Sequence, residues 1–199
     1  MTDQEIFDYL FKRAKTSKDQ EGVVAACLVK NGQILVSSPS ADDSIRHAED
    51  LVIEKAKKQG IILDENIILY TTLEPCSVRN KDISGCVSII VTTGIKNIIY
   101  ATNDPEYSQD TKQRFLTAGV NYQQIQNKEI IDRAVKLFNS TSKTPLTAWQ
   151  LPRQKKLEIF KLRPLPEIKK GLNATGKYNQ KFINSVIKGL KESKAYNRH

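Results

Sequence analysis

Histidine, cysteine and long apolar runs are scarce in this chain of 199 residues. Its two histidines are His47 and the terminal His199, so a metal site that needs an imidazole is expected to use His47. Three cysteines, an odd number, fit free thiols or metal ligands better than a disulfide framework. No apolar run approaches the roughly eighteen residues of a membrane span, so we expect no membrane partner. An acidic N-terminus without the features of a signal peptide predicts a cytoplasmic, reducing setting.

Positive charge is concentrated in the last quarter of the chain. Residues 146–199 hold thirteen of the 31 Lys and Arg residues and three of the 22 Asp and Glu residues, a net charge of +10. The remaining residues carry a net charge of −1, which accounts for the total of +9. An apolar share of 39% is enough for one packed core. We therefore expect one domain at 1–140 and a basic C-terminal extension at 141–199.

Apolar periodicity predicts strands that alternate with helices after an opening hairpin. The hairpin is indicated by Asn31-Gly32, a strong tight-turn signal between two apolar runs. Asp43 and Ser44 are candidate N-caps for the helix near His47, and Gly60 is a candidate terminator. The predicted elements are a helix at 4–15, strands at 23–29 and 33–36, a helix at 47–59, a strand at 67–71, a helix at 86–93, a strand at 97–101, a helix at 110–118, a strand at 120–125 and a helix at 128–138. This order predicts a three-layer α/β/α sandwich around a mixed sheet of about five strands.

The basic extension shows a different pattern. Four prolines between residues 145 and 166 predict an extended segment that reaches Glu167. Residues 178–190 then predict a basic amphipathic helix, with Phe182, Val186 and Leu190 on one face and Ile183 and Ile187 alongside them.

One group of side chains has the composition of a catalytic zinc site. His47 is followed by Ala48 and Glu49, and Glu74-Pro75-Cys76 and Cys86 lie further along the chain. One imidazole and two thiolates hold zinc and leave a fourth position open for water. Glu49 is not needed as a ligand, so it is free to carry protons. His47 and Cys86 are each expected to open a helix, where the positive helix end stabilises negative charge.

Simpler interpretations of these residues exist. A single histidine before an apolar stripe is often structural, and a cysteine that begins an apolar helix is often a core residue. A structural zinc would need a fourth His or Cys ligand, and the remaining thiol, Cys27, lies in an apolar strand that predicts a buried, inert side chain.

The same motifs resemble the cytidine deaminase superfamily and, within it, the pyrimidine deaminases of riboflavin biosynthesis. His47-Ala48-Glu49, the run from Tyr70 to Ser77, and Cys86 carry the resemblance, which covers about residues 20–140. Cys76 and Cys86 are separated by nine residues, where most of the superfamily has two, and this longer spacing is typical of the riboflavin branch. The run Cys76-Ser77-Val78-Arg79 is most similar to the fungal form.

The resemblance implies a reaction and a substrate class. The expected reaction is zinc-dependent hydrolytic deamination of a phosphorylated diaminopyrimidinone, with His47, Cys76 and Cys86 as metal ligands and Glu49 as the proton carrier. It also implies that the protein is a homo-oligomer. Candidate substrate contacts are Ala48, Glu74, Arg79 and Lys81. The last two are candidate phosphate partners, or else solvated charges of a loop.

Two other functions remain open from the sequence. A nucleic-acid deaminase acting on tRNA adenosine or cytidine would use the basic extension for phosphate contacts. A non-catalytic deaminase-fold subunit would act as a scaffold, although Glu49 argues against it. The extension helix could equally pack its apolar face on the sheet or on another subunit.

Overall fold

The structure of the protein is a computed structural model that describes residues 1–43, 45–79, 85–104, 108–142, 165–174 and 179–192. The chain divides into two compact units, Met1–Gln150 and Leu151–His199. The division expected after residue 140 stays a prediction. Within the described ranges, no helix is both long enough and apolar enough to cross a bilayer. The cytoplasmic setting also stays a prediction.

The first unit contains every element that the periodicity predicts, with ends that differ by three residues or fewer. The elements are α1 (Asp3–Ala14), β1 (Ala25–Lys30), β2 (Gln33–Pro39), α2 (Ala48–Lys58), β3 (Ile68–Leu73), α3 (Cys86–Val91), β4 (Asn97–Thr102), α4 (Ser108–Thr117), β5 (Asn121–Gln124) and α5 (Lys128–Asn139). Local chemistry fixes several of these ends. Thr2 and Glu5 form a capping box at the start of α1, and Asn127 caps α5.

Five strands form one mixed sheet in the order β2-β1-β3-β4-β5. β1 pairs antiparallel with both β2 and β3, whereas β3, β4 and β5 are mutually parallel. Asn31 and Gly32 have φ angles of 50° and 70°, the left-handed conformation that a two-residue hairpin of this kind requires. The mixed five-stranded sheet of the predicted fold class is therefore confirmed.

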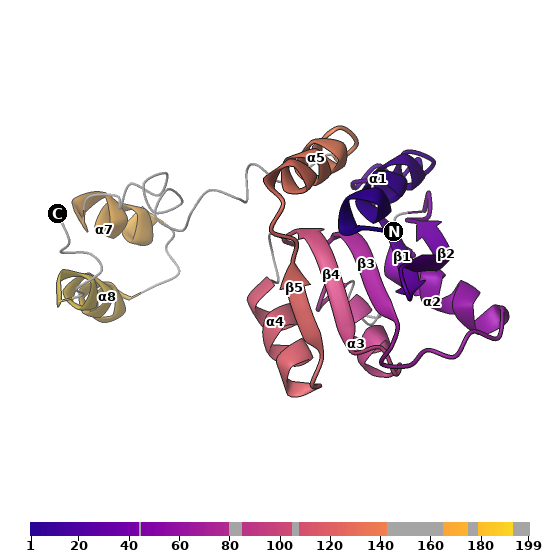
Figure 1. The fold of residues 1–199 in the computed structure, drawn as a ribbon. Coiled ribbons are helices and arrows are strands. Elements are labelled where there is room, and N and C mark those ends of the chain that lie inside the picture. Colours follow the sequence, from indigo (N-terminus) through magenta and orange to yellow (C-terminus); the bar gives the residue numbers. More distant parts are fainter. Residues whose placement is uncertain (44, 80–84, 105–107, 143–164, 175–178, 193–199) are drawn as a thin grey trace. The chain divides into compact units, whose positions relative to one another are not determined.

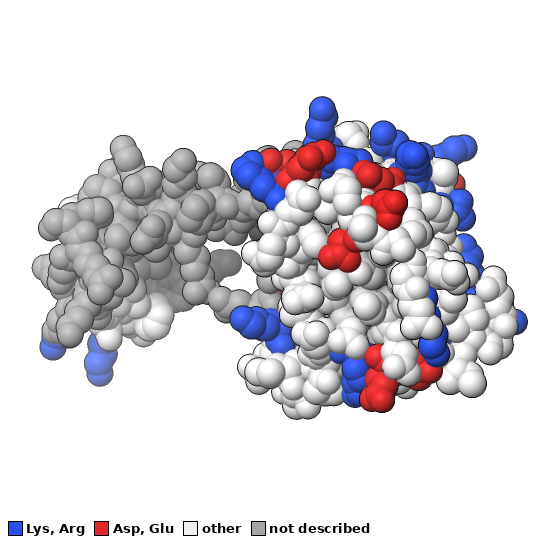
Figure 2. Space-filling model, in the orientation of Figure 1, with Lys and Arg blue, Asp and Glu red and all other residues white. Residues whose placement is uncertain are grey.

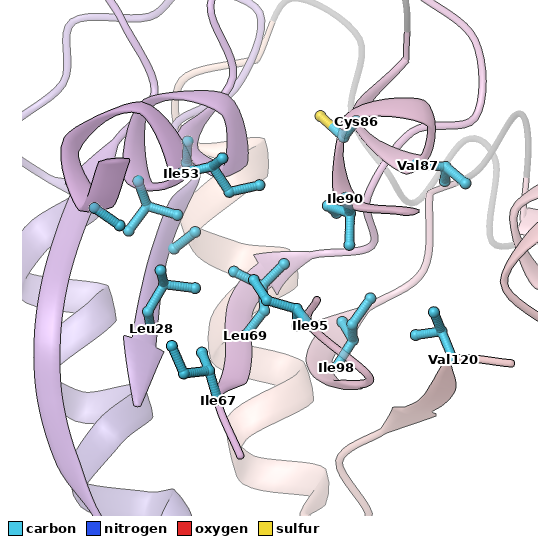
Figure 3. Packing of buried hydrophobic residues seen from close by; sticks show 14 of the residues in the cluster. Leu28, Ile53, Ile67, Leu69, Cys86, Val87, Ile90, Ile95, Ile98 and Val120 are labelled. Atoms are coloured by element: carbon cyan, nitrogen blue, oxygen red, sulfur yellow. The ribbon is translucent and has the colours of Figure 1, made fainter. Parts of the chain in front are cut away.

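Helices cover both faces of the sheet (Figure 1). α1 and α5 lie on one face, where Phe7, Leu10 and Ile130 are buried against strand residues such as Val29. α2, α3 and α4 lie on the other face. The core beneath them is apolar, and its labelled members in Figure 3 are Leu28, Ile53, Ile67, Leu69, Cys86, Val87, Ile90, Ile95, Ile98 and Val120. The candidate metal ligands His47 and Cys86 lie on this second face, at the starts of α2 and α3.

The start of α2 differs from the prediction. His47 itself is the N-cap, with an extended backbone and no side-chain capping bond. The carboxylate of Asp43 instead accepts hydrogen bonds from the backbone N–H groups of Ile45 and Arg46, and so stabilises the turn before the helix. Ser44 lies outside the described residues. The His47 side chain is therefore free of a capping role, while Gly60 ends the helix with a φ angle of 71°, as expected.

The second unit contains two described helices that contact each other, α7 (Leu165–Ala174) and α8 (Gln180–Glu192). The extended segment predicted to reach Glu167 is wrong from Leu165 onward, because Pro166 lies in the first turn of α7, where its missing N–H costs no helical hydrogen bond. The rest of that segment, 143–164, lies outside the described residues. In α8 one residue of the predicted apolar face, Ile183, is buried, whereas Phe182 of the same face is 49% exposed.

The charge distribution of the first unit agrees with its near-neutral composition. On the face shown in Figure 2, acidic and basic side chains are interspersed at two ends, and a largely uncharged surface separates them. No single sign of charge dominates this face.

Candidate metal centre

Three side chains predicted to bind a metal meet on the helical face that α2 and α3 share. His47 is the N-cap of α2, Cys76 follows β3, and Cys86 is the first residue of α3. In Figure 3 Cys86 lies at the start of α3, at the edge of the apolar cluster. Both cysteines are buried. The expectation that His47 and Cys86 each open a helix is confirmed.

The spacing of the three ligand atoms fits a zinc ion. His47 Nδ1 lies 3.5 Å from Cys76 Sγ and 3.4 Å from Cys86 Sγ, and the two sulfurs lie 3.6 Å apart. A tetrahedral zinc with ordinary bond lengths would place two sulfurs about 3.8 Å apart and a sulfur and a nitrogen about 3.6 Å apart. In the part of the chain that the structure describes, this is the one group of His, Cys, Asp or Glu side chains arranged to hold a metal.

Hydrogen bonds within the cluster of candidate ligands favour the thiolate form of Cys76. The contacts with Cys86 and His47 lower the pKa of Cys76 to about 3. Burial, together with the neighbouring Cys76 and Glu49, raises the pKa of Cys86. Burial opposes protonation of His47, but the hydrogen bond and charge of Cys76 raise its pKa on balance. A metal ion would displace the protons of His47 and Cys86, because zinc binds a neutral imidazole and thiolates.

Glu49 lies beside this triangle without belonging to it. Glu49 is 3% exposed, and its Oε2 lies 3.5 Å from Cys86 Sγ. Burial raises the pKa of Glu49. A carboxyl group with a raised pKa exchanges protons closer to neutral pH than an ordinary one does.

Thr71, on β3, contacts the other oxygen of this carboxyl. The Thr71 hydroxyl lies 2.9 Å from Glu49 Oε1 and 2.9 Å from the carbonyl oxygen of Leu73. One hydroxyl proton can be donated to only one of these acceptors at a time. Thr71 can therefore donate to an ionised Glu49, or accept from a protonated Glu49 while it donates to Leu73.

The family comparison agrees with this geometry. The family described as the cytidine and deoxycytidylate deaminase zinc-binding region matches residues 1–102, just over half of the chain. The chain belongs to this deaminase family. Its cofactor is Zn²⁺, for which the His, Cys, Cys cluster supplies suitable ligand types and distances.

Relatives in riboflavin biosynthesis are similar over part of their length. A diaminohydroxyphosphoribosylamino-pyrimidine deaminase of Schizosaccharomyces pombe is 29% identical over 106 residues, which are 50% of this chain and 26% of that protein. The riboflavin biosynthesis protein RibD of Aquifex aeolicus is 30% identical over 96 residues, which are 48% of this chain and 26% of that protein. The deaminase therefore spans about a quarter of the length of these curated relatives.

A solved structure supports the same relationship. The diaminohydroxyphosphoribosylaminopyrimidine deaminase/5-amino-6-(5-phosphoribosylamino)uracil reductase of Thermotoga maritima is 25% identical, with a TM-score of 0.63. The match covers 73% of this deaminase and 41% of the Thermotoga chain. The predicted cytidine deaminase-like fold is thus confirmed.

The predicted substrate contacts of the deaminase occupy different surroundings. Ala48 is fully buried in the apolar cluster under α2. Glu74 is 1% exposed, and its carboxylate accepts a hydrogen bond of 2.7 Å from the backbone N–H of Asp104. Arg79 contacts Cys86 and Asp50, and Lys81 lies outside the described residues. Substrate binding by these four residues stays a prediction.

Three residues that contribute to the site were not predicted from the sequence. Thr71 lies in a β-strand, Asp50 directly follows Glu49, and Gly85 directly precedes Cys86. A side-chain carbon added at Gly85 would lie 2.4 Å from the carbonyl oxygen of Ser77. The position of Gly85 next to a candidate ligand was a usable signal, whereas the role of Thr71 requires the tertiary structure.

Proposed function

We propose that the chain is a zinc-dependent hydrolytic deaminase acting on a phosphorylated diaminopyrimidinone precursor of riboflavin. The observation that carries this proposal is the triangle of His47, Cys76 and Cys86 with the buried carboxyl of Glu49 beside it. The riboflavin-pathway relatives supply the substrate class. In this proposal the three side chains hold the metal and Glu49 carries protons.

The chemistry divides between the metal and the protein. A zinc ion held by these ligands lowers the pKa of bound water towards neutrality. Glu49 accepts a proton from the attacking water and delivers it to a ring nitrogen. Glu49 later helps to protonate the leaving amino group, so that water is consumed and ammonia is released.

Thr71 supports both protonation states of Glu49 in this scheme. Its hydroxyl donates to the carboxylate before the proton is taken up. After uptake, the proton is held on Oε2, the oxygen beside Cys86, and the Thr71 hydroxyl can turn to the carbonyl of Leu73. The carboxyl group therefore keeps a fixed position while its charge changes, as proton transfer over a short distance requires.

Ammonia release from a panel of substrates tests the proposal. The panel contains ribosylamino and ribitylamino diaminopyrimidine phosphates, cytidine, deoxycytidylate, guanine and tRNA. We expect turnover of a diaminopyrimidine phosphate by a chain that carries one zinc. Turnover of tRNA alone would overturn the substrate assignment, and failure to turn over any compound would favour the scaffold function.

A nucleic-acid deaminase is the second candidate. Lys169 and Lys170 on α7 and Lys181 and Lys188 on α8 are exposed, and exposed lysines can contact phosphate groups. Under this alternative, RNA affinity would fall steeply with salt and would be lost from a chain that ends near Ser140. Homo-oligomer formation and a cytoplasmic location, expected from the sequence, remain further proposals.

A further inference from the structure

The guanidinium group of Arg79 lies directly beside one ligand of the metal centre. Its Nη2 lies 3.0 Å from Cys86 Sγ. Its Nη1 donates to Asp50 Oδ2 at 2.5 Å and to the carbonyl oxygen of Ile45 at 3.2 Å. The side chains of Arg79 and Asp50 are only 9% and 17% exposed. This ion pair is therefore largely buried, unlike a solvated loop charge.

The guanidinium of Arg79 is oriented to contact Cys86 Sγ and does not form a two-bond ion pair with Asp50. Arginine commonly pairs with a carboxylate through two parallel hydrogen bonds. Here Arg79 Nε and Asp50 Oδ1 are buried, and neither has a hydrogen-bond partner among the described residues. Leaving both atoms unpaired costs free energy, since buried polar groups are normally satisfied. The arrangement instead directs Nη2 at Cys86.

Asp50 connects this arginine to the catalytic helix. Asp50 lies in the first turn of α2, directly after Glu49 and three residues after the N-cap His47. Arg79 belongs to the segment that follows Cys76, and its guanidinium reaches Cys86 at the start of α3. Asp50 and Arg79 therefore link the helix that carries His47 and Glu49 to the second cysteine ligand.

We propose that Arg79, held by Asp50, is a positioning residue of the metal centre that fixes the Cys86 sulfur and withdraws electron density from it. This proposal rests on the proposed zinc-dependent function. Two thiolates carry enough negative charge to neutralise the two positive charges of zinc, and zinc then lowers the pKa of bound water less. An N–H donor on one sulfur reduces that offset, so the centre stays a stronger Lewis acid.

The proposal assigns Arg79 a role other than the phosphate contact expected from the sequence. Its two Nη atoms are already engaged by Ile45, Asp50 and Cys86. A phosphate contact would appear mainly in the KM for phosphorylated substrates. A sulfur contact would appear in the metal-binding properties, which can be measured without any substrate.

Zinc affinity tests the proposal most simply. The zinc dissociation constant of the full chain would be measured by competition with a chromogenic chelator for wild type, Arg79→Ala and Asp50→Asn. We expect both variants to bind zinc roughly 10- to 100-fold more weakly, because the loss of a fixed Cys86 position outweighs the stronger donation from a sulfur that is richer in electrons. Arg133→Ala is the matched control, because Arg133 also pairs with an aspartate, Asp8, but from α5 on the opposite face of the sheet.

A cobalt(II) spectrum separates this role from general loop support. The sulfur-to-cobalt charge-transfer band should move to lower energy in Arg79→Ala, because the sulfur becomes richer in electrons. It should be unchanged in Arg133→Ala. Arg79→Lys should restore only part of the zinc affinity, since one ammonium cannot reproduce the guanidinium fork. If Arg79→Ala does not fold, Asp50→Asn and Arg79→Lys provide the same comparison.

Two results would overturn the proposal. One is wild-type zinc affinity with an unshifted cobalt band in folded Arg79→Ala. The other is an increase in KM for the phosphorylated substrate with unchanged metal binding, which would restore the phosphate role. If no substrate is turned over, the proposed function fails, but the zinc and cobalt measurements still decide the role of Arg79.

Discussion

Replacing Gly85 with alanine should damage the metal centre through a single added carbon. Gly85 has a φ angle of −61°, which alanine adopts without strain, so its backbone conformation does not require glycine. The added Cβ would lie 2.4 Å from the oxygen and 2.5 Å from the carbon of the Ser77 carbonyl, and 2.8 Å from the Cys76 oxygen. These are backbone atoms, so no side chain can rotate away to relieve the clash.

The size of the effect follows from these distances. Real Cβ atoms essentially never approach another heavy atom to less than 3.0 Å, so the two segments must separate by at least 0.6 Å. That movement exceeds the tolerance of about 0.2 Å for a metal–ligand bond. Overpacking of this kind costs about 1–3 kcal/mol. If the segments at Ser77 and Gly85 relax when no metal is bound, zinc binding must force them back into the strained arrangement. Zinc affinity then falls about tenfold for each 1.4 kcal/mol of strain.

Urea unfolding and chelator competition would measure both quantities. Gly119→Ala is the control, because Gly119 has a φ angle of 64° and open space around the position of an added Cβ. That variant should lose about 1–2 kcal/mol of stability, because alanine is strained in the left-handed conformation, and it should keep its zinc affinity. Wild-type zinc affinity and stability in Gly85→Ala would refute the steric argument.

Two further predictions concern buried side chains near β1 and β3. Thr71→Val keeps the side-chain shape but removes the hydroxyl that contacts Glu49. We expect kcat for deamination to fall by about tenfold while the zinc content stays normal. An unchanged kcat would show that Thr71 has no part in the proton transfer. Burial raises the pKa of Cys27 from 9.0 to about 12, so its contribution to stability is complete below pH 9 and is lost as the pH rises towards 12. The difference in unfolding free energy between wild type and Cys27→Ala should therefore shrink across that range in urea melts, and a difference independent of pH would contradict the assignment.

Local patterns were sufficient to predict most of the first unit. The apolar stripe of α1, the Asn31-Gly32 turn and the order of strands and helices each depend on residues close in sequence. The cluster of His47, Cys76 and Cys86 that the structure brings together could also be expected, because His47 was the one internal histidine and the two cysteines follow it in one motif. Their binding of a metal stays a prediction. These features are set by short-range spacing and by composition.

Other features depend on tertiary contacts that spacing does not contain. Arg79 lies 29 positions from Asp50 and seven from Cys86, and no sequence pattern indicates that its guanidinium contacts both. Prolines predicted an extended chain where Pro166 instead enters the first turn of α7. Within the predicted apolar face of α8, the burial of Ile183 and the exposure of Phe182 likewise depend on what packs against the helix.

Zinc content and ammonia release, measured on the same preparations of wild type and Glu49→Gln, test the central claim most directly. We expect one zinc per chain in both proteins, because Glu49 lies beside the three ligands without completing them. Ammonia release from a diaminopyrimidine phosphate should fall by roughly 10²- to 10⁴-fold in Glu49→Gln, the usual contribution of a general acid–base group. Wild-type protein without stoichiometric zinc, or equal ammonia release by the two proteins, would contradict the account.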